Sequence, residues 1–442
     1  ARPSSAPAEV PEDSECSEVP SLSPSLVGSP IFPRTAPRNS RNFRIFGQIF
    51  NTINHFPMKK TIIRLILAAA VVALGFAQTA CTGKSKTDSE AKAKVDSVHP
   101  RIIIAYVTSG SDVMPDPNSM THINYAFGHV NQTFNGIDVA NPDRLHQISA
   151  LKQQNPDLKV ILSVGGWGSG RFSEMAADSL NRASFAADAK RVIDEFNLDG
   201  IDIDWEYPTS SSAGISSSPD DTQNYTLLMR DLRSAIGPDK LLTLATPGNA
   251  RFYDFPAILP YVDFINIMSY DIGTAAAHKH QAPLYESEHT RLTADQALKA
   301  HLEAGIPKDK LTLGLPFYGR GAYEYPDYMD YKDFKLLDSC TIVWDEKAQV
   351  PYIANSKGEL VMGYNDPRAI EIKCKYILDN DLLGAMYWEY TCDDAQGTLR
   401  KIVTDYMMGQ KGLDYQQAPA EHYVPTDTTA PAPKPAPAIP AN

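Results

Sequence analysis

The chain has 442 residues, of which 43% are hydrophobic and 9% aromatic, and its formal net charge at pH 7 is −12. This length can bury the core of one barrel-sized domain or of two ordinary domains. The acidic balance argues against nucleic acid and anionic membranes as partners, and it suits a neutral or cationic ligand.

Residues 1–57 are rich in proline and serine, and we expect them to be untranslated upstream sequence or a disordered arm. Residues 58–81 begin with basic side chains, continue as an apolar run and end in small residues before Cys81, which is the order of a signal peptide. The apolar run is shorter than the roughly 20 residues of a membrane-spanning helix, although a single membrane anchor remains the alternative. Its end, "QTAC", resembles the lipobox of bacterial lipoproteins, with Gln78 where a leucine-type residue is usual. We therefore expect export to the bacterial cell envelope, with lipid on Cys81, or to the extracellular medium.

A polar segment, residues 82–98, is predicted to be a tether, and residues 411–442 form a Pro/Ala-rich tail that we expect to be disordered. Between them, strand-like runs alternate with segments of helical periodicity. The expected strands are residues 101–107, 122–127, 159–166, 200–206, 241–247, 264–270, 311–317 and 384–390.

Helical periodicity is clearest in two apolar stripes, and a third helix is marked by Asp366 as N-cap with Pro367 in its first turn. Strands that alternate with helices in this way predict the α/β class and a (β/α)8 TIM barrel over residues 99–410. A doubly wound open sheet is the alternative, but no glycine-rich nucleotide fingerprint follows the first strand. Residues 321–362 predict a small inserted α+β subdomain, rich in strands, between strands seven and eight. The two stripes consist of Phe185, Ala189, Val192, Ile193 and Phe196, and of Tyr225, Leu228, Met229, Leu232, Ala235 and Ile236.

The fourth expected strand carries acids on one face. In "LDGIDIDWEYP", which runs from Leu198 to Pro208, a period of two places Asp202, Asp204 and Glu206 on one side and apolar residues on the other. The outer face of a barrel strand packs under helices, so the acids should line the interior. Because burying a carboxylate is costly unless it is paired or protonated, the ladder indicates chemistry. A hydrogen-bonded structural ladder and an oxygen-ligand metal site are the alternatives.

The ladder resembles the DxxDxDxE signature of glycoside hydrolase family 18 chitinases, with Asp199, Asp202, Asp204 and Glu206 at its acidic positions. Over residues 98–410, further motifs are similar to those of the family and occur in its order. They are "SVGG" at 163–166, "MSYD" at 268–271, "LPFYGR" at 315–320 and "MYWEY" at 386–390.

The resemblance implies a chitinase that hydrolyses β-1,4 bonds between N-acetylglucosamine residues with retention of configuration. Glu206 would be the general acid, and like-charge repulsion from the stacked carboxylates would raise its pKa. Asp204 would orient the substrate's acetamido group, whose own carbonyl oxygen attacks the anomeric carbon. Asp202 would share a proton with Asp204, Ser163 would hydrogen-bond Asp202, and Asp199 would support the strand.

The implied catalytic residues are Glu206, Asp204, Asp202 and Tyr270. Trp388 would form the floor under the reacting sugar and Trp167 a second sugar platform, because sugars stack on aromatic rings. Gly165 and Gly166 would permit close backbone approach beside the acids. The implied substrate-binding residues are Trp388, Trp167, Asp271, Met268, Tyr106, Phe127, Tyr207, Tyr318, Arg320, Gly165 and Gly166.

The implied partners are chitin or N-acetylglucosamine-containing oligosaccharides, with neither cofactor nor metal. We expect a monomer that has no nucleic-acid partner and meets the membrane only through its lipid. Two other functions stay open, an endo-β-N-acetylglucosaminidase acting on N-glycans or peptidoglycan-type chains and an inactive chitin-binding lectin of the same fold. Cys340, Cys374 and Cys392 allow at most one disulfide, and buried free thiols are the alternative.

Overall fold

A computed structural model describes residues 101–409. Its strands are β1 (Ile102–Thr108), β2 (His122–Val130), β3 (Ile137–Val139), β4 (Lys159–Gly165), β5 (Gly200–Asp204), β6 (Leu241–Pro247), β7 (Phe264–Met268), β8 (Leu311–Pro316), β9 (Tyr318–Gly321), β10 (Met329–Asp330), β11 (Thr341–Asp345), β12 (Val350–Ala354), β13 (Leu360–Gly363) and β14 (Gly384–Trp388). Its α-helices are α4 (Pro142–Ala150), α5 (Phe172–Ala177), α6 (Ser179–Glu195), α7 (Asp221–Ile236), α8 (Phe255–Ile258), α9 (Ala294–Glu303), α10 (Pro367–Asp379) and α11 (Thr398–Met407).

The central sheet closes on itself. Its strands follow the order β1-β14-β8-β7-β6-β5-β4-β2, neighbours are parallel, and β1 also pairs with β2. Ile104 shows the closure, since it lies opposite Met386 on one side and His122 on the other. β3 adds to β2 as a short antiparallel strand. The (β/α)8 barrel is therefore confirmed, and the open-sheet alternative is wrong.

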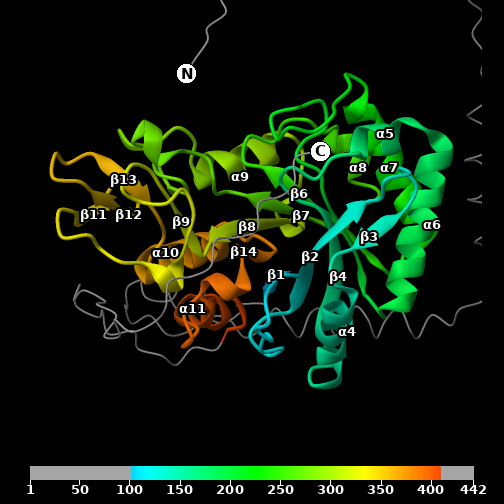
Figure 1. Ribbon diagram of the computed structural model, residues 1–442, viewed down its shortest axis with the longest axis horizontal. Coiled ribbons are helices and arrows are strands. Elements are labelled where there is room, and N and C mark those ends of the chain that lie inside the picture. The colour runs from blue at the N-terminus through cyan, green and yellow to red at the C-terminus, as the bar shows by residue number, and fades with distance from the viewer. Residues whose placement is uncertain (1–100, 410–442) are drawn as a thin grey trace, which may run out of the picture. The chain divides into compact units, whose positions relative to one another are not determined.

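The outer face of β5 packs under helices, as its alternation predicts. Ile201, Ile203 and Trp205 are fully buried. The Trp205 ring stacks on Phe172 of α5, with centroids 5.3 Å apart, and is tilted against Tyr225 of α7. Figure 1 shows α5, α6 and α7 together on this side of the barrel. Because the outer face is filled by apolar contacts, the acids of β5 are left facing the barrel interior.

The inserted subdomain follows the seventh barrel strand. Five antiparallel strands in the order β10-β9-β13-β12-β11 form it, so it extends slightly beyond the expected 321–362. Its helical part is one 3-10 turn, Tyr331–Asp333. Tyr325, Ile353 and Val361 contribute to a small core of its own. Strands β11–β13 stand on the side of the barrel away from α6 (Figure 1).

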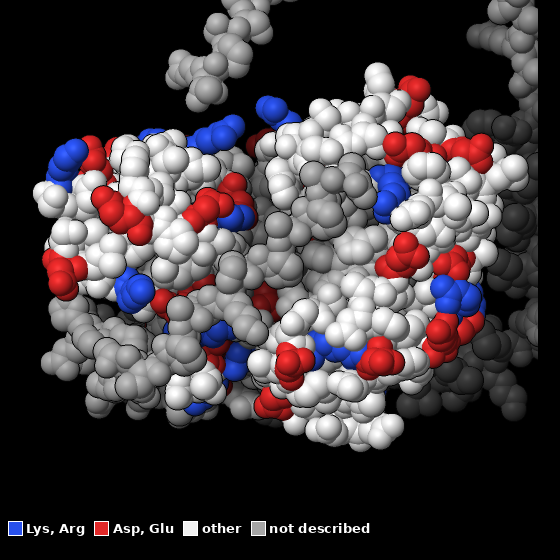
Figure 2. All heavy atoms as spheres, viewed as in Figure 1, with Lys and Arg blue, Asp and Glu red and all other residues white. Residues whose placement is uncertain are grey.

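The expectations for the arm, signal peptide, tether and tail concern residues 1–98 and 411–442, which lie outside the described residues, so they stay predictions. Within residues 101–409 no helix combines the length and the apolar character needed to cross a membrane. On the face shown in Figure 2, acidic and basic side chains are interspersed. The cysteines of the described part are buried and free, so the expected alternative of buried thiols holds for Cys340, Cys374 and Cys392.

Candidate active site

The three carboxylates of the ladder are graded in depth along β5. Asp202 is 0% exposed, Asp204 4% and Glu206, just beyond the strand, 9%. Their exposure rises toward the carboxyl end of the strand, which is the end where (β/α)8 barrels hold their functional groups. The sequence prediction of an inward ladder that rises toward the barrel mouth is therefore confirmed.

Asp202 is held by donors from four other strands. Its Oδ2 accepts from the Tyr106 hydroxyl at 2.9 Å and the Ser163 hydroxyl at 2.8 Å. Its Oδ1 accepts from Thr243 at 2.6 Å and from the Asn266 amide at 3.4 Å. Burial raises the pKa of Asp202 and these hydrogen bonds oppose the shift. Sequence reasoning missed Thr243 and Asn266, although period-two alternation in β6 and β7 would have marked them as inward polar residues.

Asp204 differs from Asp202 because its Oδ1 is buried without a hydrogen-bond partner among the described residues. Burial, followed by the charges of Glu206 and Asp202, raises its pKa well above the usual value. This oxygen is available to a proton or to a bound ligand.

The two glycines of "SVGG" let β4 pass close to this acid. A Cβ on Gly165 would lie 2.0 Å from the Asp204 carbonyl oxygen, and one on Gly166 would lie 2.7 Å from the Phe127 ring. Both residues have positive φ, and the Gly166 amide donates to the Asp204 carbonyl at 2.9 Å. The expected close approach is present, and larger residues would push the acid strand away.

Glu206 has a pKa raised to about 7. Burial is the largest cause, a hydrogen bond with Tyr207 opposes it, and the charge of Asp271 adds to it. The sequence argument assigned this shift to the stacked carboxylates. That assignment is wrong in its emphasis, because burial is the largest cause of the raised pKa. The acid that adds to the shift is Asp271, which follows β7 and is not part of the ladder.

Two tyrosines lie beside the acids. Tyr270, at the end of β7, is buried, its hydroxyl donates to the Met386 sulfur at 3.6 Å, and Asp204 and Glu206 both raise its pKa after burial. Tyr253, after β6, has its pKa raised by burial and then by the same two carboxylates, and its hydroxyl donates to the Trp205 carbonyl at 3.2 Å. Sequence reasoning missed Tyr253, and its place after a barrel strand was the available signal.

Trp388 lies among aromatic rings at the end of β14. Its ring stacks on Phe127, with centroids 5.6 Å apart, and is tilted against Tyr106 at 5.5 Å. Tyr106 is also a donor to Asp202, so the same residue joins the aromatic floor to the ladder. Met268, at the end of β7, is buried in the main core. Non-proline cis peptide bonds precede Phe127 and Tyr207 and follow Trp388.

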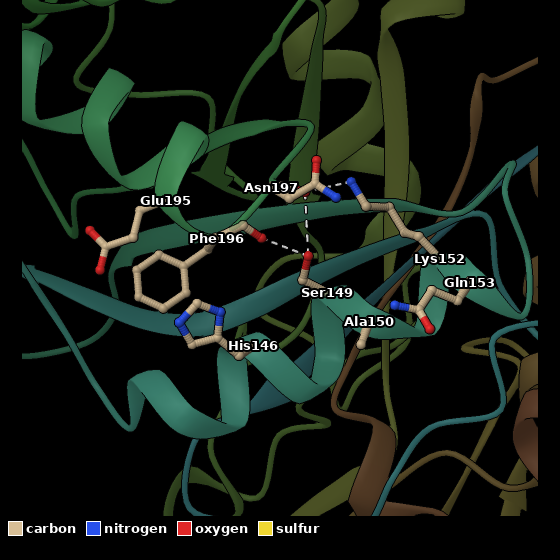
Figure 3. A pocket seen from close by; sticks show the side chains of 8 residues that line it. All are labelled: His146, Ser149, Ala150, Lys152, Gln153, Glu195, Phe196 and Asn197. Atoms are coloured by element: carbon tan, nitrogen blue, oxygen red, sulfur yellow. Dashed lines mark hydrogen bonds between the residues drawn. The ribbon is translucent and has the colours of Figure 1, made fainter.

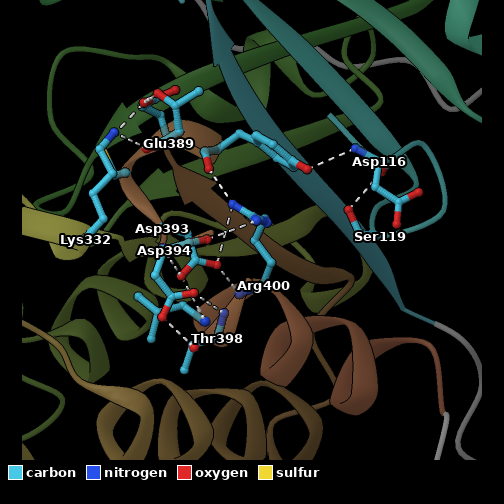
Figure 4. Close-up of polar contacts among 12 residues, drawn as sticks. Asp116, Ser119, Lys332, Glu389, Asp393, Asp394, Thr398 and Arg400 are labelled. Carbon is cyan, nitrogen blue, oxygen red and sulfur yellow. Dashed lines mark hydrogen bonds and ion pairs between the residues drawn. The ribbon is translucent and has the colours of Figure 1, made fainter. Parts of the chain in front are cut away.

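After Trp388 in the chain, a polar network joins the segment that follows β14 to the start of α11. Asp393 accepts from the backbone amides of Leu399 at 3.1 Å and Arg400 at 2.9 Å (Figure 4). Arg400 donates to the Tyr390 carbonyl at 2.8 Å, and its guanidinium lies 4.2 Å over the Tyr390 ring. These contacts fix the segment that carries the tryptophan.

Asp271, the acid of "MSYD", has both oxygens engaged. Arg320 donates to Oδ1 and to Oδ2, each at 2.8 Å, and the Tyr318 hydroxyl donates to Oδ2 at 2.9 Å. Arg320 also pairs with Asp327 at 3.1 Å. The hydrogen bond to Asp271 is the main reason why the pKa of Arg320 is raised. Sequence reasoning named Asp271, Arg320 and Tyr318 separately, but only the structure brings them into one hydrogen-bonded cluster.

Trp167 lies on the rim rather than beside the acids, with 64% of its surface exposed. Its ring meets Tyr207 edge to face at 6.5 Å, and Tyr207 stacks on Phe252 at 5.3 Å. The predicted platform is thus continued by Phe252, a residue that the sequence argument did not single out. A half-open aromatic wall of this kind suits the apolar faces of sugar rings.

A surface pocket of about 370 Å³ lies at the other end of the barrel (Figure 3). The ends of α4 and α6 line it, and the Ser149 hydroxyl donates to the Phe196 carbonyl at 2.6 Å. Lys152 pairs with Asp199 at 3.0 Å, just before β5. Asp199 therefore supports the strand start, as expected, and lies apart from the three inner acids.

Among residues 101–409 no group of three or more His, Cys, Asp or Glu side chains is arranged to hold a metal ion. The oxygens of Asp202 and Asp271 are engaged by protein donors, as described above.

A barrel whose mouth holds buried acids and aromatic platforms is the arrangement expected of a glycoside hydrolase. Residues 102–393 match the family Glycosyl hydrolases family 18. The chain therefore belongs to this family, and it is a glycoside hydrolase of the chitinase type.

Relatives agree with this assignment. Chitinase A1 of Niallia circulans is 30% identical over 486 residues, covering 87% of this chain and 67% of its own. The solved family 18 N-acetylglucosaminidase of Paenibacillus barengoltzii is 30% identical with a TM-score of 0.62, and covers 69% of this chain and 99% of its own. The group IV chitinase of Ostrinia furnacalis, solved with allosamidin, is 28% identical with a TM-score of 0.63. The match covers 69% of this chain and 97% of that chitinase chain.

Proposed function

We propose that the enzyme hydrolyses β-1,4 bonds between N-acetylglucosamine units of chitin by a retaining, substrate-assisted mechanism with Glu206 as the general acid. The observation that carries the proposal is the graded ladder, in which the outermost acid, Glu206, is the most exposed of the three and has its pKa raised to about 7. A general acid works best when its pKa lies near the working pH.

In the first step, Glu206 gives its proton to the glycosidic oxygen as the bond from that oxygen to the anomeric carbon breaks. The carbonyl oxygen of the substrate's own acetamido group forms a bond to the same carbon from the other side. In the second step, water attacks that carbon, Glu206 takes the proton from the water, and the carbonyl oxygen leaves. Two inversions at one carbon give net retention.

We assign Asp204 to accept a hydrogen bond from the acetamido N–H, because its buried Oδ1 has no hydrogen-bond partner within residues 101–409. Tyr270 donates a hydrogen bond to the same group, and Asp202 exchanges a proton with Asp204. Burial of Asp204 near two other acids keeps its pKa high, so a proton is available to the pair. Trp388 supports the reacting sugar, while Trp167 and Tyr207 bind units further along the chain.

A protein nucleophile would need a second carboxylate about 5–5.5 Å from the acid, across the sugar ring. Asp202 is committed to four donors and Asp271 to Arg320 and Tyr318. Attack by either acid would break these hydrogen bonds. This engagement supports the assignment of the nucleophile to the substrate.

The mechanism predicts that cleavage requires an N-acetyl group on the sugar before the cut bond. Fully deacetylated chitosan should bind the acidic protein without being cut, while chito-oligosaccharides of equal length are hydrolysed. Product release measured by chromatography, with the first-formed anomer followed by NMR, checks this. Rapid cleavage of the deacetylated polymer, or a first product of inverted configuration, would contradict the mechanism.

The second candidate function is an endo-β-N-acetylglucosaminidase that acts on N-glycans or peptidoglycan-type chains. One observation favours it, since a structural relative bears the name N-acetylglucosaminidase. Digestion of colloidal chitin, a high-mannose glycoprotein and peptidoglycan side by side separates the two activities. Faster release from the glycoprotein or from peptidoglycan would assign the enzyme to the second activity.

Export and lipid attachment at Cys81 complete the proposal, and they rest on the segment 58–81 alone. The wild-type protein should partition into the detergent phase, and Cys81→Ala should move it to the aqueous phase. A wild-type protein that is already aqueous after cleavage at another residue would instead identify a secreted enzyme.

A further inference from the structure

A second surface pocket, of about 390 Å³, lies between helices α9 and α10 on the outer ring of the barrel. We name it the α9–α10 pocket, and its walls include Tyr285, Tyr376, Asp295, Asp379 and Asn380. None of these residues takes part in the proposed mechanism. The volume falls in the range of pockets that bind small ligands.

Tyr285 is the open aromatic ring of this pocket. It is 41% exposed, whereas Tyr376 is buried behind it, and the two rings meet edge to face at 6.1 Å. A buried aromatic neighbour holds a ring without covering its other face. The exposed face of Tyr285 is therefore free to stack on a flat apolar surface such as one side of a pyranose ring.

The backbone around Tyr285 is fixed at three points. The amides of Leu284 and Tyr285 donate to the carbonyl of Ala348, in the turn between β11 and β12, at 2.9 and 3.4 Å. The Asp295 amide, in the first turn of α9, donates to the Leu284 carbonyl at 3.2 Å. A platform held by both the insertion and the barrel loses little freedom when a ligand binds.

Polar groups surround the ring on one side. Tyr376 donates its hydroxyl to Asp295 Oδ1 at 2.9 Å, and the Asn380 amide donates to the Tyr376 carbonyl at 2.9 Å. Lys299 pairs with the other oxygen of Asp295 at 2.6 Å, and Lys375 also lines the pocket, so Asp379 is the acid left to accept from a ligand. Burial and then the charges of Asp295 and Asp379 raise the pKa of the Tyr285 hydroxyl, which is consistent with carboxylates near the ring's polar end. The pocket thus combines an apolar face with hydrogen-bond acceptors.

The pocket at the other end of the barrel lacks this combination. Its aromatic ring, Phe196, is buried and covered by His146, with centroids 4.4 Å apart (Figure 3). Ser149 and Lys152 already donate to protein groups there. Of these two pockets, only the α9–α10 pocket presents an exposed aromatic ring beside carboxylates.

We propose that the α9–α10 pocket is a second carbohydrate-binding site, which takes one unit of an N-acetylated sugar chain with Tyr285 as its stacking platform. A neutral N-acetylglucosamine unit offers an apolar ring face to the tyrosine, and hydroxyl and amide donors to Asp379. The choice of this sugar rests on the proposed function. When the enzyme is bound to chitin, the polysaccharide nearest to this pocket is the substrate itself.

Two sites on one molecule act together only on a polymer or a solid surface. A chain held in the α9–α10 pocket keeps the enzyme at high effective concentration over neighbouring chains. A short soluble substrate that fits the cleft alone gains nothing from the pocket. The proposal therefore predicts a split between insoluble and soluble substrates.

The test compares Tyr285→Ala, which removes the ring, with Tyr285→Phe, which keeps it, and with Leu180→Ala, an exposed apolar residue on α6. Adsorption to insoluble chitin is measured in the Glu206→Gln background, so that the solid is not digested. We expect Tyr285→Ala to weaken adsorption by about fivefold, which corresponds to about 1 kcal/mol. The other two variants should stay within about twofold.

In the active enzyme, Tyr285→Ala should lower kcat/KM on insoluble chitin and leave kcat/KM on a soluble chitotriose derivative unchanged. Equal adsorption of all variants, or an equal loss on the soluble substrate, would overturn the second site. Thermal unfolding of each variant identifies a loss that comes from misfolding. Failure of the proposed function is a separate outcome. If the wild-type enzyme cuts neither substrate, adsorption of the variants to insoluble chitin can still be measured, because binding does not require turnover.

Discussion

Replacement of Glu206 by glutamine should remove nearly all turnover and leave the fold and sugar binding intact. The amide has the size of the acid but cannot give a proton to the leaving oxygen. General acid catalysis contributes about 10²- to 10⁴-fold, so we expect kcat to fall by at least about two orders of magnitude. Initial rates on a chito-oligosaccharide and binding by calorimetry measure the two quantities separately.

Glu195→Gln is a matched control, because Glu195 lies on the exposed end of α6, where it pairs with Arg191. Its kcat should equal that of the wild type. If Glu206→Gln kept more than about a tenth of kcat, less than about 1.4 kcal/mol of the barrier would depend on this residue. Another group would then be the acid.

The pH profile gives an independent check on the same residue. Because Glu206 must be protonated to act as an acid, kcat/KM should fall as the pH rises through its pKa of about 7. A profile that stays flat to pH 9 would contradict the assignment. Residual activity in Glu206→Gln should lack this alkaline limb.

Replacement of Asp204 by asparagine is the second large effect that we expect. The asparagine fills the same buried space, but it cannot accept the acetamido N–H with a charged oxygen or share a proton with Asp202. Loss of one preorganised electrostatic contact at a reacting group costs about 10²- to 10³-fold in kcat. The expected loss should appear in kcat on N-acetylated substrates, measured by single-turnover rates.

Asp157→Asn, on an exposed loop before β4, serves as the control and should keep full activity. EDTA should change neither enzyme, since the acids act without a metal in this mechanism. Loss of wild-type activity in EDTA, restored by a divalent ion, would revive the metal interpretation of the ladder. Wild-type rates in Asp204→Asn would show that the substrate's acetamido group is oriented by another residue.

The sequence predicted the barrel well because its signals are local. All eight barrel strands lie within a few residues of their expected positions, and Asp366 caps α10 with Pro367 in the first turn. The alternation of apolar and acidic residues in β5 was sufficient to predict that Trp205 faces the helices and that the acids face the barrel interior. Each of these features depends on neighbours one to four residues away.

Local sequence patterns could not predict contacts between strands that lie far apart in the sequence. The donors to Asp202 come from β1, β4, β6 and β7, and the pairing of Asp271 with Arg320 joins residues 49 positions apart. Phe252 and Tyr253 lie beside the site because the loop after β6 brings them against Tyr207 and the Trp205 carbonyl. The sequence marked which groups were unusual, but it did not show which of them meet.

The sequence by itself determined the barrel, the strand that carries the acids and the order of those acids from the interior to the mouth. A period of two fixes which face each side chain takes, and a closed parallel sheet fixes what that face meets. Only the tertiary structure decided the raised pKa of Glu206 and the pairing of Asp271 with Arg320, because burial and charge interactions are sums over the whole surrounding protein. It also decided where Tyr285 and Tyr376 come together, since the segments that carry them become neighbours only when β8 pairs with β14 across the inserted subdomain.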